Sequence, residues 1–431
     1  MRHVLAKFLP SAALVITTCA LACGGAPEGT GASEGDATSD GSQTASDGAT
    51  TVGASTLDTT DASAGPQTSG SETDGATTDA TGSTTGATSS DAATTDVTTD
   101  VTTDVTTDVT DATTDAPTTG EPTDTGVDTG GPLDDVLTLD HVQVKGTHNS
   151  YHQEPLIPFD PSHEYSHAPL DVQLESQGVR AFELDIHQAP GGFQVYHIAV
   201  IDAVTSCLSF SDCMETIKGW SDAHPLHLPI FVWLEIKDET GGQPIDASDL
   251  LLLEDEIRST FPEDQLFTPD DLSAGYPNVR AALEAEGWPT LGDVRGQVMF
   301  IMLSVDEHAE HLTSGFTTLA GRAMFARATP EHFDDPWAAV AKLGTGGQDV
   351  VDAHARRLLI ATNVCGAGES DDECTGALET AKASGLHMLK DDFPAPVNNM
   401  EYFLDFPDGN PARCNPVTAP PECTSEALED L

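Results

Sequence analysis

From about residue 139 onward, short runs of β-branched and aromatic residues alternate with longer stretches whose apolar residues recur at helical spacing. The short runs predict strands at His141–Lys145, Ala181–Ile186, Phe193–His197, Ile230–Ile236, Val298–Leu303, Leu358–Asn363 and His387–Leu389. The stretches between them predict helices at Ser211–Trp220, Leu250–Thr260, Arg280–Glu286, Trp337–Lys342, Val350–Arg357 and Cys374–Ala383. This alternation is typical of a parallel sheet, and we predict an α/β fold, a TIM-like (β/α)8 barrel that is regular or distorted. An open doubly wound sheet is the alternative, although no glycine-rich nucleotide loop follows the first strand.

The segment before the barrel has a different composition. Residues 24–131 are nearly all Thr, Ser, Asp, Ala and Gly, and they include 20 acidic residues and no Lys or Arg. A Thr-Thr-Asp-Val repeat runs from Thr94 to Thr113, with too few apolar groups to offset the entropy of an ordered chain. We therefore predict a low-complexity, disordered stalk over 23–132 and a TIM-like barrel domain over 133–431. A calcium-binding repeat array is the weaker alternative, because the glycines of such arrays are missing.

The N-terminus predicts export. Arg2 and Lys7 precede an apolar run, Phe8–Ile16, that is too short to cross a bilayer, so residues 1–22 are interpreted as a lipoprotein-type signal peptide. Leu21-Ala22-Cys23 resembles a lipobox with Cys23 as the lipidated residue. Ala20 stands where a larger aliphatic residue is usual, and cleavage without lipidation is the alternative. The prediction is an envelope lipoprotein, at the outer membrane or cell surface, or a secreted protein, held to a membrane by its N-terminal lipid.

Charge and cysteine spacing agree with this interpretation. From residue 132 onward the chain has 51 acidic and 15 basic residues, a surface that repels nucleic acid and suits divalent cations. The six cysteines after the leader fall into three pairs close in sequence, and in an oxidising compartment adjacent pairing is the simplest of the possible connectivities. The predicted disulfides are Cys207–Cys213, Cys365–Cys374 and Cys414–Cys423. Nothing in the sequence indicates an oligomeric state.

Polar residues occur at several strand ends. Glu183, Asp185 and His187 share one face of a strand whose other face is apolar, and Glu235 and Lys237 follow the same pattern. Barrel enzymes carry their catalytic groups at the carboxyl ends of strands. Each residue taken singly could equally be a cap or a solvated rim position. Several charges in one apolar-backed mouth would repel one another, and a metal ion would offset that repulsion.

At this point the sequence resembles a known family. The X region of phosphatidylinositol-specific phospholipases C is matched by His148-Asn149-Ser150, Glu183-x-Asp185, Tyr196-His197 and Leu234-Glu235. The order resembles the calcium-dependent branch, which includes bacterial secreted members, and residues 139–395 are compatible with it. In the metal-independent branch a His-Asp and an Arg occupy the positions of Asn149 and Asp185 here.

The resemblance implies a site and a reaction. It implies Ca2+ held by oxygen atoms of Asn149, Glu183, Asp185 and Glu235. His148 and His197 would stabilise the phosphorane and transfer protons, with His197 protonating the diacylglycerol oxygen. The substrate would be an inositol phospholipid, and the product a cyclic inositol phosphate that water then opens.

Three neighbouring residues are less clearly assigned by sequence. Lys237 could contact the phosphate or form a rim salt bridge with Asp238 or Glu239. Asp391 or Asp392 could orient a catalytic histidine, although a solvated loop is the favoured interpretation there.

Competing patterns remain open. His163-Glu164-Tyr165-Ser166-His167 has the H-E-x-x-H spacing of zinc proteases, but the flanking prolines leave little room for the required helix, and a loop over the barrel mouth is expected. A transition metal could be held by His148, His152, His187 or His197.

Two other functions compete with the favoured one. A metal-dependent glycerophosphodiester phosphodiesterase would use a similar barrel, although its first motif has His-Arg. A non-catalytic surface-binding or adhesion lipoprotein is the non-enzymatic alternative. The sequence leaves open whether the substrate is phosphatidylinositol, a glycosylated inositol lipid or a soluble phosphodiester, and the acidic surface disfavours docking on anionic bilayers.

Overall fold

The computed structural model describes residues 130–238, 244–305, 307–398, 400–406 and 411–429. The predicted signal peptide, Cys23 and the stalk up to residue 129 lie outside the described residues, as does Glu239. Among the residues that are described, no helix is long and apolar enough to cross a membrane.

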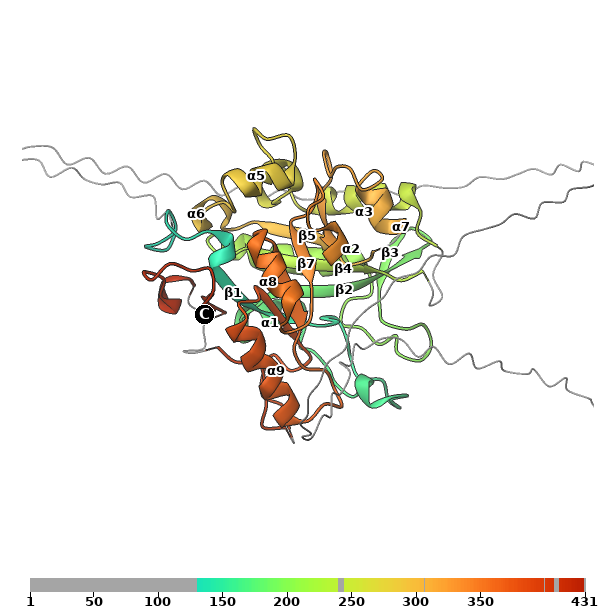
Figure 1. Cartoon of the computed structure of the whole chain (residues 1–431). Helices are drawn as coiled ribbons and strands as arrows, with labels where there is room; N and C mark the ends of the chain where they lie inside the picture. Colours follow the sequence, from blue (N-terminus) through green and yellow to red (C-terminus); the bar gives the residue numbers. More distant parts are fainter. Residues whose placement is uncertain (1–129, 239–243, 306, 399, 407–410, 430–431) are drawn as a thin grey trace, which may run out of the picture. The chain divides into compact units, whose positions relative to one another are not determined.

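Eight parallel strands close into a barrel, which confirms the predicted fold class (Figure 1). The strands are β1 (Val142–Thr147), β2 (Val179–Ala189), β4 (Ile230–Ile236), β5 (Val298–Met302), β6 (Met324–Ala328), β7 (Val340–Lys342), β8 (Leu359–Asn363) and β9 (Met388–Asp391). Pairing of β1 with both β9 and β2 closes the ring. Two further strands are antiparallel: β3 (Gly192–Val195) forms a hairpin with β2, and β10 (Ala412–Cys414) extends β1.

Helices surround the strands, with α8 and α9 along one side of the barrel and α3, α5 and α7 along another (Figure 1). The α-helices are α1 (Leu170–Gln177), α2 (Phe210–Ala223), α3 (Ala247–Thr260), α4 (Pro269–Leu272), α5 (Val279–Ala285), α6 (Leu291–Val294), α7 (Glu307–Leu312), α8 (Gln348–Ala355) and α9 (Asp371–Ala383). Short 3-10 turns are η1 (Leu139–His141), η2 (Pro161–His163), η3 (Glu263–Gln265), η4 (Pro330–His332) and η6 (Ser425–Ala427). Residues 329–339, between β6 and β7, contain only η4, so the barrel is distorted from the regular (β/α)8 pattern.

Most predicted elements exist, and the errors have a physical reason. All seven predicted strands are present, although Phe193–His197 corresponds to the hairpin strand β3 and not to a barrel strand. The predicted helix at Trp337–Lys342 is wrong, because its last three residues form β7. This segment is alanine-rich and buried, so its apolar run has no periodicity that separates a strand from a helix.

The two faces of each strand pack into different cores. Phe182, Leu184 and Ile186 of β2 face the helices, in the outer core. Phe231 and Trp233 of β4 belong to a second cluster that fills the barrel interior. The three predicted disulfides are present and fix loops beside α2, α9 and β10.

Candidate active site

Three carboxylates meet at the barrel mouth, which is here the carboxyl ends of β1, β2, β4 and β9. Glu183 and Asp185 project from β2 on the face opposite the outer core, as the alternation predicted, and both are fully buried. Glu235 of β4 lies directly beside Asp185 in the parallel register. One oxygen of each of the three side chains lies within 4.8 Å of the others.

Glu183 is neutralised by lysines that the sequence analysis did not assign to the site. The ammonium of Lys390, from β9, contacts its carboxylate, and Lys342, from β7, lies 3.3 Å away. Burial would raise the pKa of Glu183, but Lys342 and Lys390 outweigh it and hold that pKa well below its usual range. Burial lowers the pKa of Lys390 to about 7, against the attraction of Glu183. Glu183 is therefore ionised and paired with two lysines.

Asp185 is paired less completely. Its Oδ2 lies 3.2 Å from Lys237 Nζ in an ion pair, and among the described residues no hydrogen bond of good geometry reaches either oxygen of this buried carboxylate. Burial raises the pKa of Asp185 to about 6, and Glu235 adds to this while Lys237 opposes it. Lys237 also donates to Glu235 at 2.9 Å, so it pairs with the mouth carboxylates and not with Asp238.

The arrangement fits a hard divalent cation. Oxygen atoms of three carboxylates converge, and the buried Asp185 carboxylate shares its lysine, Lys237, with Glu235. Ca2+ takes oxygen ligands from carboxylates and from amide carbonyls, and such an ion would satisfy this carboxylate.

Asn149 begins the turn that follows β1. Its φ of 44° lies in the left-handed region, which asparagine tolerates better than most residues. The next residue, Ser150, donates its N–H to the Glu183 carbonyl at 2.9 Å and accepts the Glu183 N–H on Oγ at 2.8 Å. These two bonds fix the Asn149 turn against the strand that carries Glu183 and Asp185.

His148 is held from both sides. Its Nδ1 lies 3.0 Å from Asp392 Oδ1, and its Nε2 points toward Glu183 Oε1 at 3.9 Å. Burial would lower the pKa of His148, but Asp392 and Glu183 outweigh it and raise that pKa. Asp391 and Asp392 are both buried, so the favoured interpretation of a solvated loop is wrong. Asp392 orients His148, and Asp391 accepts the Phe393 N–H at 2.7 Å.

His197 follows β3, and a residue that the sequence did not single out orients it. Its Nδ1 lies 2.7 Å from Asp202 Oδ2, and Asp202 Oδ1 lies 2.9 Å from His152 Nε2. An acidic residue five positions after a histidine is too common to signal this contact. His187 is directed elsewhere, stacking on Tyr196 and bonding to its carbonyl at 2.7 Å.

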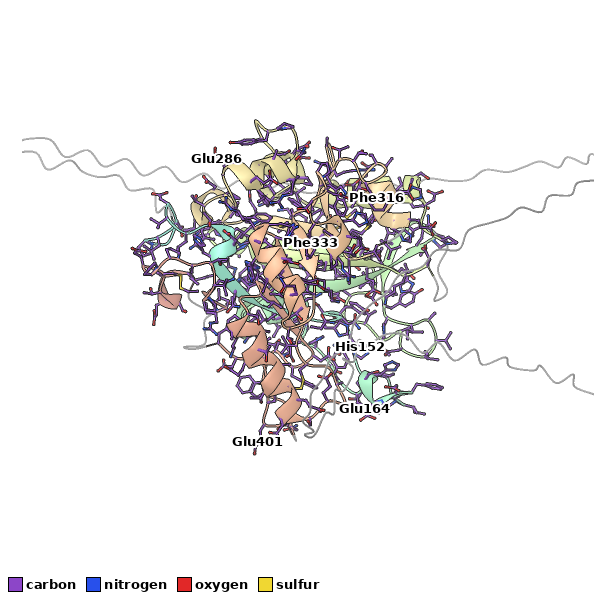
Figure 2. The ribbon with its side chains drawn as sticks, viewed as in Figure 1. His152, Glu164, Glu286, Phe316, Phe333 and Glu401 are labelled. Carbon is purple, nitrogen blue, oxygen red and sulfur yellow. A yellow bond between two sulfur atoms is a disulfide. The ribbon has the colours of Figure 1, made fainter. Side chains whose placement is uncertain are left out.

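The H-E-x-x-H segment is a loop, as expected, and its two histidines point to different partners. Only η2, which ends at His163, interrupts it, so no helix places both rings on one face. His167 Nε2 lies 2.8 Å from the His148 carbonyl, and burial lowers the pKa of His167 to about 4, so the neutral ring donates this bond. Figure 2 marks this part of the chain with His152 and Glu164.

A family model described as phosphoinositide phospholipase C, Ca2+-dependent, matches residues 137–192 and 188–416. No curated protein matches the chain.

Three solved structures illustrate the similarity. A Ca2+-dependent phosphatidylinositol-specific phospholipase C from Streptomyces antibioticus is 21% identical, with a TM-score of 0.46 over 60% of this chain and 96% of that chain. A calcium-dependent phosphoinositol-specific phospholipase C from a Gram-negative Pseudomonas species, in a myoinositol complex, is 18% identical, with a TM-score of 0.48 over 66% and 98%. A Staphylococcus aureus phosphatidylinositol-specific phospholipase C is 14% identical, with a TM-score of 0.37 over 62% and 92%.

Proposed function

The chain belongs to the family of calcium-dependent phosphoinositide phospholipases C, and from this premise we propose that it cleaves the glycerol–phosphate bond of an inositol phospholipid. The products are diacylglycerol and a cyclic inositol phosphate that water can open. The observation that carries the proposal is the convergence of three carboxylates: an oxygen of the buried Asp185 lies within 4.8 Å of oxygens of Glu183 and Glu235, and Asp185 shares its lysine, Lys237, with Glu235.

Four residues would hold the calcium ion that the family implies: Asn149, Glu183, Asp185 and Glu235. When bound, Ca2+ would lower the pKa of the attacking inositol hydroxyl and neutralise charge that develops on the phosphate. The side chains are oxygen donors from two strands and one turn, all fixed by backbone pairing.

The two histidines have different roles in the proposed reaction. The inositol oxygen forms the new bond to phosphorus, and its proton passes to a basic group of the mouth. The bond to the glycerol oxygen breaks as that oxygen takes a proton from His197. His148, which Asp392 holds by Nδ1 at 3.0 Å, directs Nε2 into the mouth and donates a hydrogen bond to the phosphate.

Cations at the mouth support an anionic substrate. The protein has only 17 Lys and Arg against 71 Asp and Glu, yet four basic residues lie on or just after barrel strands facing the carboxylates. They are Lys237, Arg327, Lys342 and Lys390. Arg327 Nε has no hydrogen-bond partner among the described residues, and we propose that it turns to a phosphate oxygen when the substrate binds. Lys237 is proposed to transfer from Asp185 to the phosphate when calcium binds.

Exposed apolar residues beside the mouth support a substrate that lies in a lipid surface. Leu156, Ile157 and Phe159 on the loop after β1 are 102%, 84% and 79% exposed, and Val200 on the loop after β3 is 98% exposed. The loops are tied together, because Gln153 donates to the Val204 carbonyl at 3.2 Å. An acidic protein that repels anionic headgroups could engage a bilayer through such residues.

We also propose that the chain is exported and lipid-anchored at Cys23, with residues 23–132 as a spacer for the domain of 133–431. The three disulfides support an oxidising compartment. Mass spectrometry of the membrane fraction tests the anchor, since a chain that begins at Cys23 must carry the added lipid mass.

The test of the reaction is phosphodiesterase activity of the full-length protein on phosphatidylinositol micelles, first in excess EGTA and then with Ca2+ restored. Activity that disappears and returns with Ca2+ is expected. Cleavage of soluble glycerophosphodiesters alone, or revival only by Zn2+ or Mn2+, would assign the protein to the glycerophosphodiesterase class. If no substrate is cleaved under any of these conditions, the proposed reaction is wrong and the protein is a binding protein.

A further inference from the structure

A second group of ligating side chains lies beside the calcium site but shares no residue with it. It consists of His163 on the loop that follows β1, and His197 and Asp202 on the loop that follows β3. One ligating atom of each lies within 4.8 Å of the other two. The group therefore joins two loops at the edge of the barrel mouth.

Asp202 is the centre of the group. It is fully buried, and its Oδ2 lies 2.7 Å from His197 Nδ1 and 3.8 Å from His163 Nε2. Its other oxygen, Oδ1, lies 2.9 Å from His152 Nε2. Burial would raise the pKa of Asp202, but hydrogen bonds from His152 and His197 outweigh it and lower that pKa, so the carboxylate is ionised.

His152 anchors the carboxylate from outside the group. Its Nδ1 lies 3.1 Å from the Tyr165 carbonyl while its Nε2 faces Asp202, so both ring nitrogens face acceptors. Its ring also stacks on Tyr165, with centroids 4.2 Å apart. Metal-binding carboxylates are commonly oriented by such an outer hydrogen bond.

His163 is the unsatisfied member. It is only 7% exposed, and its Nε2 lies 3.8 Å from Asp202 Oδ2, too long for a hydrogen bond but within reach of an ion held between the two. Among the described residues its Nδ1 has no hydrogen-bond partner either, so the ring is buried without the pairing that buried polar groups usually have.

We propose that His163, His197 and Asp202 form a binding site for one transition-metal ion of the Zn2+ class. Zinc accepts two imidazoles and one carboxylate with a fourth position open. The proposed calcium site offers only oxygen ligands, which suit a harder cation. His197 is 23% exposed through its side chain, so the ion has a route from solvent.

The consequence for activity rests on the proposed function of His197 as the general acid. A ring nitrogen that is bound to a metal ion cannot carry a proton, so His197 could not become the imidazolium that a general acid must be. The ion would also take the Asp202 oxygen that now orients His197. Zinc is therefore an inhibitor that leaves calcium binding intact.

The experiment titrates the EDTA-treated, full-length protein with Zn2+ by calorimetry in the presence of Ca2+, and with Co2+ by visible absorption. The variant is His163→Gln, because His163 has no part in the proposed reaction. The control is His332→Gln, which removes another histidine that is paired with an aspartate, Asp335, at 2.7 Å. Thermal melting of both variants checks that they fold.

The expected result is one Zn2+ equivalent bound by the wild type and by the control. In His163→Gln the Zn2+ affinity should fall by at least about tenfold, with loss of the Co2+ absorption. Zn2+ should inhibit the calcium-dependent activity of the wild type, while His163→Gln keeps its activity and resists Zn2+. Equal Zn2+ affinity in wild type and His163→Gln would overturn the site.

The binding arm separates this proposal from the function. If no phospholipase activity is found but Zn2+ binding still depends on His163, the metal site stands and the function of the mouth fails. If the protein is active and Zn2+ neither binds nor inhibits, the metal site fails alone.

Discussion

The two ends of the barrel treat buried charge in opposite ways. At the amino end, in the first residues of β2, Arg180 donates to both oxygens of Glu429 and to the Leu174 and Val179 carbonyls. Arg295, before β5, likewise forms a bidentate pair with Asp134. At the mouth, Glu183 is paired with Lys342 and Lys390, whereas Asp185 and Glu235 share one lysine, Lys237.

Asp185 shows the difference most clearly, because among the described residues its one ion-pair partner, Lys237, is shared with Glu235 and no hydrogen bond of good geometry reaches its oxygens. Paired and fully hydrogen-bonded charges cost little, whereas an unsatisfied buried carboxylate costs free energy of folding. The comparison indicates that the amino end is built for stability and that the mouth retains unsatisfied charge for a ligand. Substitutions at the two ends should therefore separate activity from stability.

The largest effect is expected at the mouth histidines. His148→Ala and His197→Ala should each lower kcat by roughly 10²- to 10⁴-fold, because each removes a proton donor at the phosphate or the leaving group. Each ring is paired with a buried carboxylate, His148 with Asp392 and His197 with Asp202, so the thermal midpoint should also fall, and kcat is therefore compared per folded molecule. Initial rates with phosphatidylinositol and melting by circular dichroism measure both quantities. A variant with near-normal kcat would remove its residue from the mechanism.

The reverse separation is expected at the amino end. Glu429→Gln leaves the buried Arg180 without its counter-charge, and the free energy of unfolding should fall by about 3–5 kcal/mol. Activity per folded molecule should not change, since Glu429 contacts Arg180 at the amino end of β2 and the mouth lies at the carboxyl end of that strand. The matched control is Glu426→Gln, which alters an exposed glutamate three residues away and should have no effect. Equal losses in both variants would contradict the importance of the ion pair.

A stabilising substitution is expected at the mouth. Asp185→Asn replaces a carboxylate whose pKa is raised to about 6, mainly by burial. A raised pKa in an acid means that the folded state is penalised once pH exceeds the unfolded pKa, and the penalty is complete above about pH 6. Without calcium at pH 8, the variant should therefore be more stable by on the order of 1–3 kcal/mol, measured by urea unfolding. Glu235→Gln, at a more exposed position, should change the stability less.

A smaller, gradual effect is expected in acid at the amino end. Burial lowers the pKa of His227 to about 4 and that of His387 to about 3. The unfolded chain binds these protons near pH 6.5, so stability is full above that pH and falls as the pH drops toward the folded values. Each histidine should remove up to about 1.4 kcal/mol per pH unit in this window. Urea midpoints between pH 7 and 5 should show a shallower slope in His387→Gln, and an unchanged slope would contradict this origin.

The sequence predicted those parts of the molecule that depend on local pattern. Ile230–Ile236 was predicted with its observed bounds because a run of β-branched and aromatic residues ends at polar groups. The faces of β2 followed from alternation, so Glu183 and Asp185 were correctly expected on the side opposite the outer core. The same reasoning was wrong for the buried alanine-rich segment before Lys342. A segment that is buried on all sides has no alternation of apolar and polar residues from which a strand or a helix could be predicted.

The partners of the site residues could not be predicted, because they depend on closure of the barrel. Asp392 reaches His148 across 244 positions in sequence, and Lys390 reaches Glu183 across 207. The two lysines that pair with Glu183 are Lys342 of β7 and Lys390 of β9, and both strands lie far from β2 in the sequence. Asp202 is close to His197 in sequence, but only the folded loop turns its carboxylate toward three histidines.

The most direct test of the comparison is thermal unfolding of the full-length protein and of Asp185→Asn, each in EGTA and in saturating Ca2+. Ca2+ should stabilise the wild type, by about 2.7 kcal/mol at a concentration one hundred times its Kd. Asp185→Asn should already be more stable than the wild type in EGTA and should gain little from Ca2+. A wild type that is unaffected by Ca2+, or a variant that is less stable than the wild type in EGTA, would contradict the claim that the mouth keeps Asp185 unsatisfied for a metal ion.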